Sequence, residues 1–167
     1  MNLIVAVDKA WGIGSDGNLL YSIPEDMKFF RKTTLNNVVV MGRTTLESLP
    51  DSKPLPKRTN IVLSANTDYQ VEGAVVCHNI EEVLKEIKQY DTEDVFVIGG
   101  KTVYEQLLSY CQKAYVTKIN EVRPSDCKLI NLDELSDWRC IYISEIHNHE
   151  GIEYTFNTYE NSKCKEF

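Results

Sequence analysis

Short apolar runs alternate with helix-forming segments along most of this chain, and this alternation limits its fold more than any other feature. The apolar runs have the length of buried strands, and two of them run directly into glycine. We predict strands at Leu3–Val7, Val38–Met41, Ile61–Leu63, Ala74–Cys77, Val95–Ile98 and Ala114–Ile119. Helices are predicted between them at Pro24–Leu35, Thr44–Ser48, Ile80–Gln89 and Thr102–Ser109. Such alternation indicates a mainly parallel sheet with helices on both faces.

The end of the chain lacks helical spacing and predicts a hairpin. Cys140–Ile146 and Glu153–Tyr159 have the pattern of two long strands joined by the polar turn His147–Gly151. With 167 residues and no repeat or linker, the chain fits one domain, residues 1–167. The predicted fold is an α/β three-layer sandwich in this single domain. Its sheet is mixed, mostly parallel and eight-stranded, with an antiparallel C-terminal hairpin and about four helices.

Charge and composition argue against several kinds of partner. The chain has 25 acidic and 18 basic residues and a net charge of −7, which disfavours nucleic acid and anionic membranes. No apolar stretch approaches the roughly 20 residues of a spanning helix, and Leu3–Val7 lacks the basic segment of a signal peptide. The five cysteines are scattered without a Cys-x-x-Cys pair, as in a reduced cytoplasmic protein. His147, His149 and Glu150 are too few ligands to predict a metal site.

Asp26 is the first candidate for chemistry. Three-and-four spacing puts Asp26 on one face of its predicted helix with Ile23, Met27 and Phe30. A carboxylate on an apolar face is costly to bury unless a partner donates hydrogen bonds to it. One interpretation is therefore an acid reserved for a ligand. The other is an acid that only balances the positive end of the helix dipole, and the helix alone leaves both open.

Two glycine turns each follow a strand and open a helix. They are Gly42-Arg43-Thr44-Thr45 and Gly99-Gly100-Lys101-Thr102. Free amides at a helix start, with a cation and hydroxyls nearby, suit a phosphate. Neither turn is a P-loop or a complete dinucleotide fingerprint, so an ordinary strand-to-helix turn remains open for each. Because parallel strands end at one sheet edge, the two turns together favour a bound dinucleotide.

Arg58 and a glycine-rich segment complete the candidates. Arg58 follows Pro54 and Pro56, and a stiff loop of this kind can present a guanidinium to a carboxylate. A solvated surface arginine is the other interpretation. The segment Trp11–Asn18 holds three glycines and an Asp-Gly turn signal, which predicts a loop.

These features stand in the order of a known family. The matching segments are Ile13-Gly14 with Gly17 and Leu19, Ile23 to Met27 with Phe30, Val40 to Thr45 with Glu47-Ser48, Pro54 to Ser64, Ile98 to Gly100 with Val103-Tyr104, and Tyr115 to Ile119. Through these segments the sequence resembles dihydrofolate reductases along nearly its whole length. Each segment is a modest match alone, whereas the whole series in this order is specific.

The resemblance implies NADPH-dependent reduction of 7,8-dihydrofolate to 5,6,7,8-tetrahydrofolate, a reaction of one-carbon metabolism. The nicotinamide gives a hydride to the pterin, and the protein supplies position and electrostatics. Asp26 would anchor the pterin by hydrogen bonds, and Thr117 would join that network, while a water would bring the proton. Asp26, Tyr21 and Thr117 are thus the expected catalytic residues. The expected state is a cytoplasmic monomer that binds dihydrofolate and antifolate-like small molecules.

The resemblance also implies binding residues. The expected substrate contacts are Ile4, Val5, Met27, Phe30, Leu49, Leu55, Arg58, Ile98 and Thr117. The expected cofactor contacts are Ala6, Ile13, Gly14, Asn18, Leu19, Gly42, Arg43, Thr44, Thr45, Leu63, Ser64, Ile98, Gly99, Gly100, Lys101, Thr102, Val103 and Tyr104. Arg58 would clamp the α-carboxylate of the glutamate tail, and Arg43, with Ser64 nearby, would bind the 2′-phosphate of NADPH. The family's Gly99-Gly100 bond is cis, and a mobile lid would span about Ala10 to Ile23.

Three segments depart from the family pattern. The lid usually carries Leu-Pro-Trp, and here it is Leu19-Leu20-Tyr21. The tryptophan normally helps to hold a water near the pterin oxygen, and Leu20 lacks the backbone constraint of proline. Lys101 stands where some members have another glycine. Asp126 matches an acid of the family's Asp-Thr-x-Phe-Pro loop, but Leu129-Ile130 replaces Phe-Pro.

Two alternatives remain at the level of the sequence. A related riboflavin-pathway reductase, acting on a ribosylated pyrimidine, would share the cofactor turns but would not explain Arg58 and Thr117. A non-catalytic nucleotide-binding domain would explain the glycines but would leave Asp26 without a role.

Overall fold

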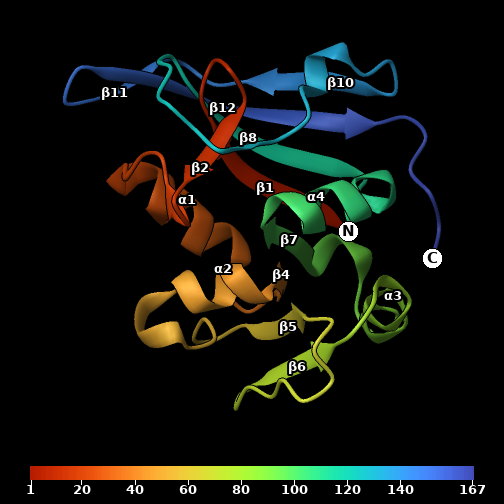
Figure 1. Ribbon diagram of the computed structural model, residues 1–167. Helices are drawn as coiled ribbons and strands as arrows, with labels where there is room; N and C mark the ends of the chain where they lie inside the picture. Colours follow the sequence, from red (N-terminus) through yellow and green to blue (C-terminus); the bar gives the residue numbers. More distant parts are fainter.

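The computed structural model describes residues 1–167, and a twisted sheet runs through its centre (Figure 1). Its strands lie in the order β10 (Trp138–Ile143), β12 (Ile152–Asn161), β8 (Lys113–Ile119), β1 (Asn2–Val7), β7 (Val95–Gly99), β4 (Val38–Gly42), β5 (Thr59–Leu63) and β6 (Ala74–Cys77). The strands from β8 to β6 are parallel, and β12 and β10 are added antiparallel beside β8. The predicted α/β sandwich, with a mixed, mostly parallel sheet of eight strands and an antiparallel C-terminal hairpin, is confirmed.

Four α-helices cover the two faces of the sheet. They are α1 (Pro24–Thr34), α2 (Arg43–Ser48), α3 (Ile80–Ile87) and α4 (Lys101–Leu107). Strand β4 packs on both sides: Val38 and Val40 join the core that includes residues of α3 and α4, whereas Val39 and Met41 pack with Leu46 of α2. A strand buried on both faces needs a continuous apolar run, and this is the pattern that identified it in the sequence.

Short 3-10 helices fill several connections. They are η1 (Pro50–Ser52), η2 (Thr92–Asp94), η3 (Leu108–Tyr110) and η4 (Leu132–Glu134). The helix predicted at Thr102–Ser109 is therefore split into α4 and η3. The longest helix, α1, has 11 residues. None of the helices has the length and apolar character needed to cross a membrane.

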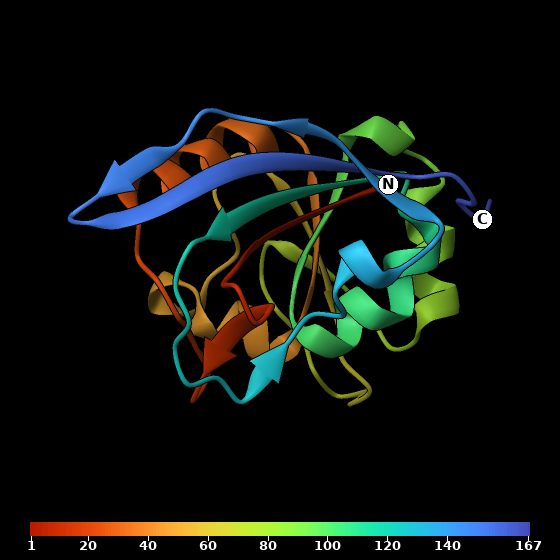
Figure 2. The same ribbon diagram turned by 90° about the horizontal axis from the view of Figure 1, so that it is seen from above.

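The segment Trp11–Asn18 is not the loop that the sequence predicted. It contains β2 (Gly12–Ser15), which forms a hairpin with β3 (Asn18–Leu19) and also pairs with β9 (Cys127–Lys128), as Figure 2 shows for β2 and β9. Asp16 and Gly17 form the turn with φ values of 51° and 77°. The Asp-Gly signal correctly indicated this turn. The strands were missed because they are very short and two of the residues in β2 are glycines.

The polar turn predicted at His147–Gly151 is also shorter than expected. His147–His149 form strand β11, which pairs antiparallel with β12, and only Glu150 and Gly151 turn the chain. The ring of His147 stacks on Tyr154 with a centroid distance of 5.4 Å. The aromatic neighbour on β12 stabilises an extended conformation, which the polarity of the segment alone did not reveal.

Candidate functional site

Asp26 and Thr117 are joined by a short hydrogen bond between α1 and β8. The Thr117 hydroxyl donates to Oδ1 of Asp26 at 2.6 Å across 91 residues of sequence. Pro24 begins α1 and puts Asp26 in the first turn, while Phe29 on the same helix packs on Phe156 of β12 with ring centroids 4.7 Å apart. The helix start and this aromatic contact therefore bring the acid to the sheet.

The environment of Asp26 favours its neutral form. Burial raises the pKa of Asp26 above its ordinary value, and the hydrogen bond from Thr117 acts in the opposite direction. Thr117 itself is only 2% exposed. No protein group donates a hydrogen bond to Oδ2 of Asp26. The acid therefore has one oxygen held by the protein and a second oxygen available to a donor from a ligand.

The helix face predicted to be apolar is only partly buried. Ile23 is buried, Asp26 and Phe30 are half-buried, and Met27 is 57% exposed. The predicted apolar face of α1 is therefore covered at Ile23 but open at Met27, whose sulfur accepts a contact of 3.8 Å from the Ser22 hydroxyl. An exposed thioether beside a half-buried acid provides apolar surface for a flat ligand.

The other expected substrate residues lie on neighbouring strand ends and loops. Leu49, Leu55 and Ile98 are half-buried and pack on one apolar cluster with Met41. Ile4 is buried, and its carbonyl accepts a hydrogen bond of 2.8 Å from the Tyr104 hydroxyl. Val5 is half-buried beside it on β1. Tyr104, expected as a cofactor contact, is buried in the core, and its hydrogen bond to Ile4 joins α4 to β1.

Arg58 is positioned by the end of α1 and by its own loop. Its Nε donates to the Pro56 carbonyl at 3.0 Å, and its Nη1 donates to Oγ1 of Thr34 at 3.1 Å. Partial burial lowers the pKa of the Arg58 guanidinium, with the charge of Arg31 as a second cause, but the group stays cationic. The guanidinium therefore has a defined position and keeps further N–H groups free for an anion.

Asn60 supports the loop of Arg58, although it was not among the predicted site residues. Its side chain is buried, accepts from the Leu55 N–H at 3.0 Å, and donates to the carbonyls of Leu55 and Arg58, both at 3.0 Å. These bonds hold the loop that carries Leu55 and Arg58. The only sequence signal for this role of Asn60 is its polar side chain at the start of the apolar strand that follows Arg58.

The two glycine turns meet at one edge of the sheet. A Cβ on Gly42 would lie 3.1 Å from Cγ2 of Val103 and 3.9 Å from the backbone nitrogen of Gly100. Gly99 has a φ of 138°, and a Cβ there would lie 3.2 Å from Oγ1 of Thr45. The Gly99-Gly100 peptide bond is cis, as the family resemblance implied. No side chain caps the start of α2 or α4, so their first amides remain available.

Basic and hydroxyl side chains surround these turns. Arg43 lies beside the first turn, where its Nε contacts Oε1 of Glu47 at 2.8 Å and its guanidinium carbon lies 4.5 Å from the centre of the Tyr69 ring. Glu47 raises the pKa of Arg43. Thr44, Lys101 and Thr102 are exposed, Thr45 and Leu63 are half-buried, and Ser64 is buried with its hydroxyl accepting from the Asn66 N–H at 3.3 Å. Tyr69 was not predicted as a site residue, because its loop carries no motif.

The lid residues are held by the small sheet of β2, β3 and β9. Ile13 is buried, Gly14 pairs with Cys127, and Asn18 and Leu19 are exposed at the hairpin end. Oδ2 of Asp126 accepts a hydrogen bond of 2.9 Å from the backbone of Asp16. This bond links the lid to the residue before β9, and Leu129-Ile130, which replace Phe-Pro, come just after that strand.

Tyr21 does not join the Asp26 pair directly. It forms no hydrogen bond with Asp26 or Thr117, and its hydroxyl is buried without a protein partner. Burial, and next the Asp8 carboxylate, raise the pKa of Tyr21. The guanidinium carbon of Arg123 lies 4.0 Å from the centre of the Tyr21 ring. The structure therefore brings Asp26 and Thr117 together but leaves Tyr21 in an adjacent cluster with Ala6 and Ile23.

Comparison with known proteins agrees with this geometry. The family model described as dihydrofolate reductase matches residues 1–161. A dihydrofolate reductase from Staphylococcus haemolyticus is 32% identical over 162 residues, covering 96% of this chain and 90% of the relative, and one from Drosophila melanogaster is 39% identical over 139 residues, covering 75% of each. The chain belongs to the dihydrofolate reductase family.

A solved dihydrofolate reductase has the same fold. The Enterococcus faecalis enzyme, in complex with NADP(H) and RAB-propyl, superposes with a TM-score of 0.86 and 36% identity, covering 96% of this chain and 95% of that one. As a dihydrofolate reductase, the chain is an NADPH-dependent oxidoreductase that reduces 7,8-dihydrofolate to 5,6,7,8-tetrahydrofolate. The riboflavin-pathway reductase and the non-catalytic domain are not favoured by these matches.

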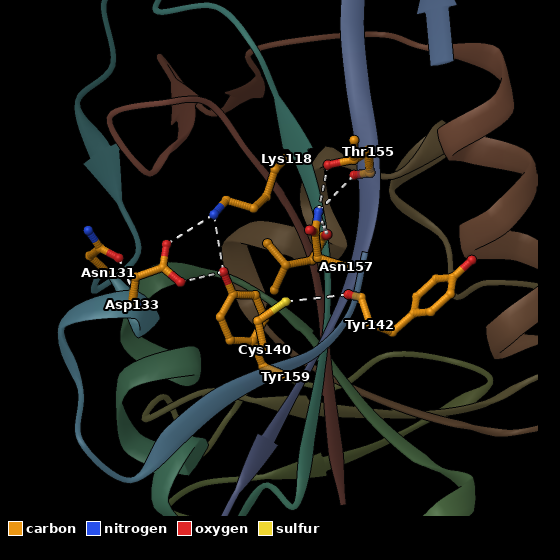
Figure 3. Close-up of polar contacts among 9 residues, drawn as sticks. Lys118, Asn131, Asp133, Cys140, Tyr142, Thr155, Asn157 and Tyr159 are labelled. Atoms are coloured by element: carbon orange, nitrogen blue, oxygen red, sulfur yellow. Dashed lines mark hydrogen bonds and ion pairs between the residues drawn. The ribbon is translucent and has the colours of Figure 1, made fainter. Parts of the chain in front are cut away.

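A polar network in this dihydrofolate reductase lies where the lid leaves β1. Figure 3 shows Lys118, Asp133 and Tyr159 pointing toward one another from β8, η4 and β12. Lys118 Nζ contacts Oδ2 of Asp133 at 3.0 Å and the Tyr159 hydroxyl at 3.1 Å, and that hydroxyl donates to Oδ1 of Asp133 at 2.7 Å. Lys118 also lies 5.4 Å from the Trp11 ring centre. Trp11 has a φ of 59°, and these neighbours hold its ring in place.

Proposed function

We propose that Asp26 anchors the pterin ring of dihydrofolate and that Thr117 orients the acid. The observation that carries this proposal is the 2.6 Å hydrogen bond that occupies one oxygen of Asp26 and leaves the other without a protein donor. The amino group and the adjacent ring nitrogen of a pterin are donors that suit a carboxylate. Asp26 thus binds and polarises the pterin, and a water brings the proton to the reduced bond.

The residues at the two glycine turns fit NADPH. The uncapped helix starts supply free amides, glycine leaves room at both turns, and Arg43 and Lys101 supply positive charge. The cofactor supplies the hydride from its nicotinamide ring. Arg43 would bind the 2′-phosphate with Ser64 nearby, Thr45 and Thr102 would bind the diphosphate and ribose, and the backbone at Ala6 and Ile13 would orient the carboxamide. The remaining cofactor residues named from the family resemblance would complete this surface.

Arg58 would hold the glutamate tail of the substrate. Its position between Thr34 and Pro56 leaves part of the guanidinium free to form paired hydrogen bonds with an α-carboxylate. Leu49 and Leu55 would pack on the aminobenzoyl ring, and Ile4, Val5, Phe30 and Ile98 would border the pterin and the centre of the substrate. Exposed Met27 would be covered by the bound substrate. Tyr21 would act from the edge of this site.

Turnover of purified protein with NADPH and dihydrofolate tests the proposal. We expect loss of the reduced-nicotinamide absorbance only when dihydrofolate is present, and a large loss of turnover in Asp26→Asn with NADPH affinity unchanged. Thr117→Val, which keeps the shape of the side chain but removes the donor, should lower turnover by a smaller factor. If Asp26→Asn turns over dihydrofolate at the unaltered rate, Asp26 does not anchor the substrate.

We further propose that the protein is a cytoplasmic monomer without nucleic-acid or membrane partners and that it binds antifolate-like molecules. The acidic net charge of −7 supports the absence of polyanionic partners. Light scattering coupled to size exclusion checks the mass of 19.2 kDa expected for one chain. Competition of a diaminopyrimidine with dihydrofolate checks the antifolate site, and cell fractionation checks the location.

A further inference from the structure

Arg123 joins the loop after β8 to the far end of the lid. Its Nη1 donates to the Leu20 carbonyl at 2.7 Å, and its guanidinium covers the ring of Tyr21 at 4.0 Å. A planar guanidinium can make both contacts at once, since it stacks through its face and donates through its edge. The two lid residues it contacts, Leu20 and Tyr21, are the ones that replace the Pro-Trp of the family pattern.

The backbone of Arg123 is tied to the near end of the lid. Its N–H donates to Oδ2 of Asp8 at 3.1 Å, and Oδ1 of Asp8 accepts from the N–H groups of Gly12 at 2.8 Å and Ala10 at 2.9 Å. Asp8 is only 1% exposed. Pro124 follows directly and restricts the backbone of Arg123 to extended conformations. One buried carboxylate thus fixes both the base of the lid and the residue that holds its other end.

Gly12 shows how closely these segments approach one another. A Cβ at this position would lie 2.7 Å from Oγ of Ser125, 3.0 Å from Cδ1 of Leu20 and 3.1 Å from Oδ1 of Asp8. The near end of the lid, its far end and the loop that carries Arg123 therefore meet at one point. A larger residue at this position would require the side chains of Ser125 and Leu20 to shift.

The far end of the lid leads directly into the substrate site. Tyr21 packs in a cluster with Ala6 of β1 and buried Ile23, and α1 begins at the next residue, Pro24. Asp26 follows in the first turn of that helix. The path from Arg123 to the acid is therefore short and passes through packed side chains. The other contact of Arg123, an Nε to Oε2 distance of 3.5 Å to Glu121, joins two exposed side chains and contributes little.

We propose that Arg123 is a positioning residue for dihydrofolate reduction. It holds Leu20 and Tyr21 where the lid must lie for hydride transfer, and it supplies a constraint that the missing proline would otherwise give. Arg123 contacts neither substrate nor cofactor in this role, and it acts through Leu20 and Tyr21. The proposal rests on the dihydrofolate reductase activity of the chain and adds a residue that controls the lid.

The test compares Arg123→Met with Arg139→Met. Methionine keeps an unbranched apolar stem but removes the hydrogen bonds and charge, while Arg139 is an exposed arginine paired with Glu160 at the far edge of the sheet. The main readout is the deuterium isotope effect on kcat, measured with NADPH labelled at the transferred position. KM is measured as well, and so is turnover per active site, with the active sites counted by titration with NADPH. We expect Arg123→Met to lower kcat about tenfold and to raise the isotope effect, because hydride transfer becomes the slow step. Arg139→Met should change neither.

Two further variants keep the result interpretable. Arg123→Lys retains the charge without the planar group, and it should fall between the unaltered enzyme and Arg123→Met. In a Tyr21→Leu background, Arg123→Met should have a smaller effect, because the stacked ring is already gone. The proposal is overturned if both Arg123 variants show the same isotope effect and the same turnover per titrated site as Arg139→Met. If Arg123→Met does not fold, the same comparison is made with Arg123→Lys.

Discussion

Asp26 serves two opposing requirements. Its burial at the start of α1 makes ionisation costly, yet the same half-buried position gives a ligand an unshared carboxylate oxygen. Thr117 offsets part of the cost by donating to the other oxygen. A side chain in this situation stabilises a complex more than it stabilises the free protein.

This conflict predicts that Asp26→Asn unfolds at a higher urea concentration than the unaltered protein at pH 7. The raised pKa means that the folded chain holds the Asp26 proton more tightly than the unfolded chain, so stability falls as pH rises from the unfolded pKa through the folded pKa. Above that window the neutral amide removes the cost of holding a buried charge. The difference in unfolding free energy should shrink near pH 4. Equal urea midpoints at both pH values would contradict this account.

Arg58 makes a prediction about the tail of the substrate. Arg58→Ala should raise KM for dihydrofolate roughly 10- to 100-fold with a smaller change in kcat, because a charged hydrogen-bonded pair is lost away from the reacting bond. Dihydropteroate lacks the glutamate and serves as the matched control. Steady-state kinetics should show little change in KM for dihydropteroate. A similar loss for both substrates would mean that Arg58 supports the loop and does not clamp the tail.

At the scale of elements, the network around Lys118 connects β8, η4 and β12 (Figure 3), and Lys118 also contacts the ring of Trp11. Although partial burial of Asp133 acts to raise its pKa, the hydrogen bonds from Tyr159 and Lys118 and the charge of Lys118 together lower it. Burial and Asp133 raise the pKa of the Tyr159 hydroxyl, which stays protonated as the donor. The network is therefore complete only while Asp133 is ionised.

The network predicts a stability loss in acid. A lowered folded pKa means that the contribution of Asp133 is present above its unfolded pKa, near pH 4, and is lost as pH falls through the folded pKa. Asp133→Asn should cost less than about 1 kcal/mol at neutral pH, since the side chain is half-exposed and screened. Urea unfolding at pH 7 and pH 3 should show the variant and the unaltered protein converging in acid. A difference that grows in acid would rule out this role.

Residue patterns could predict the main sheet but not the small one. Apolar runs such as Val38–Met41 are visible because strands buried on both faces need them. The lid hairpin was missed because Gly12 and Gly14 carry no side-chain pattern, and β11 was missed because its support comes from Tyr154 on another strand. At the site, a helix start indicated Asp26, whereas Asn60, Tyr69 and Arg123 act through contacts that only the folded chain forms.

At the scale of the whole molecule, the candidate site is built where parallel strands end and helices begin. Arg58, which precedes β5 and contacts the end of α1, is the exception. Asp26 faces β8, and the glycine turns lie at the ends of β4 and β7. This edge is where ligands bind in open α/β sheets, and the strand order brings distant segments to it. Ligand binding should therefore stabilise the entire domain.

Thermal unfolding with cofactor measures this coupling. NADPH at about 100 times its Kd should stabilise the protein by about 2.7 kcal/mol, seen as a higher Tm. Arg43→Ala should reduce the Tm shift given by NADPH and leave the shift given by NADH unchanged, because only NADPH carries the 2′-phosphate. Arg139→Ala is the matched control at the opposite end of the sheet. Equal losses for both cofactors would exclude a phosphate-specific role for Arg43.

The 91 residues between Asp26 and Thr117 also matter while the chain is being made. A nascent chain that has released α1 but not β8 has an acid without its hydroxyl donor and a helix without the strand it faces. Contacts of such long sequence separation form late in folding, since the intervening chain must first be ordered. A folate analogue present during synthesis would therefore find no pocket on early fragments, and would begin to act as a folding partner only after β8 has left the ribosome.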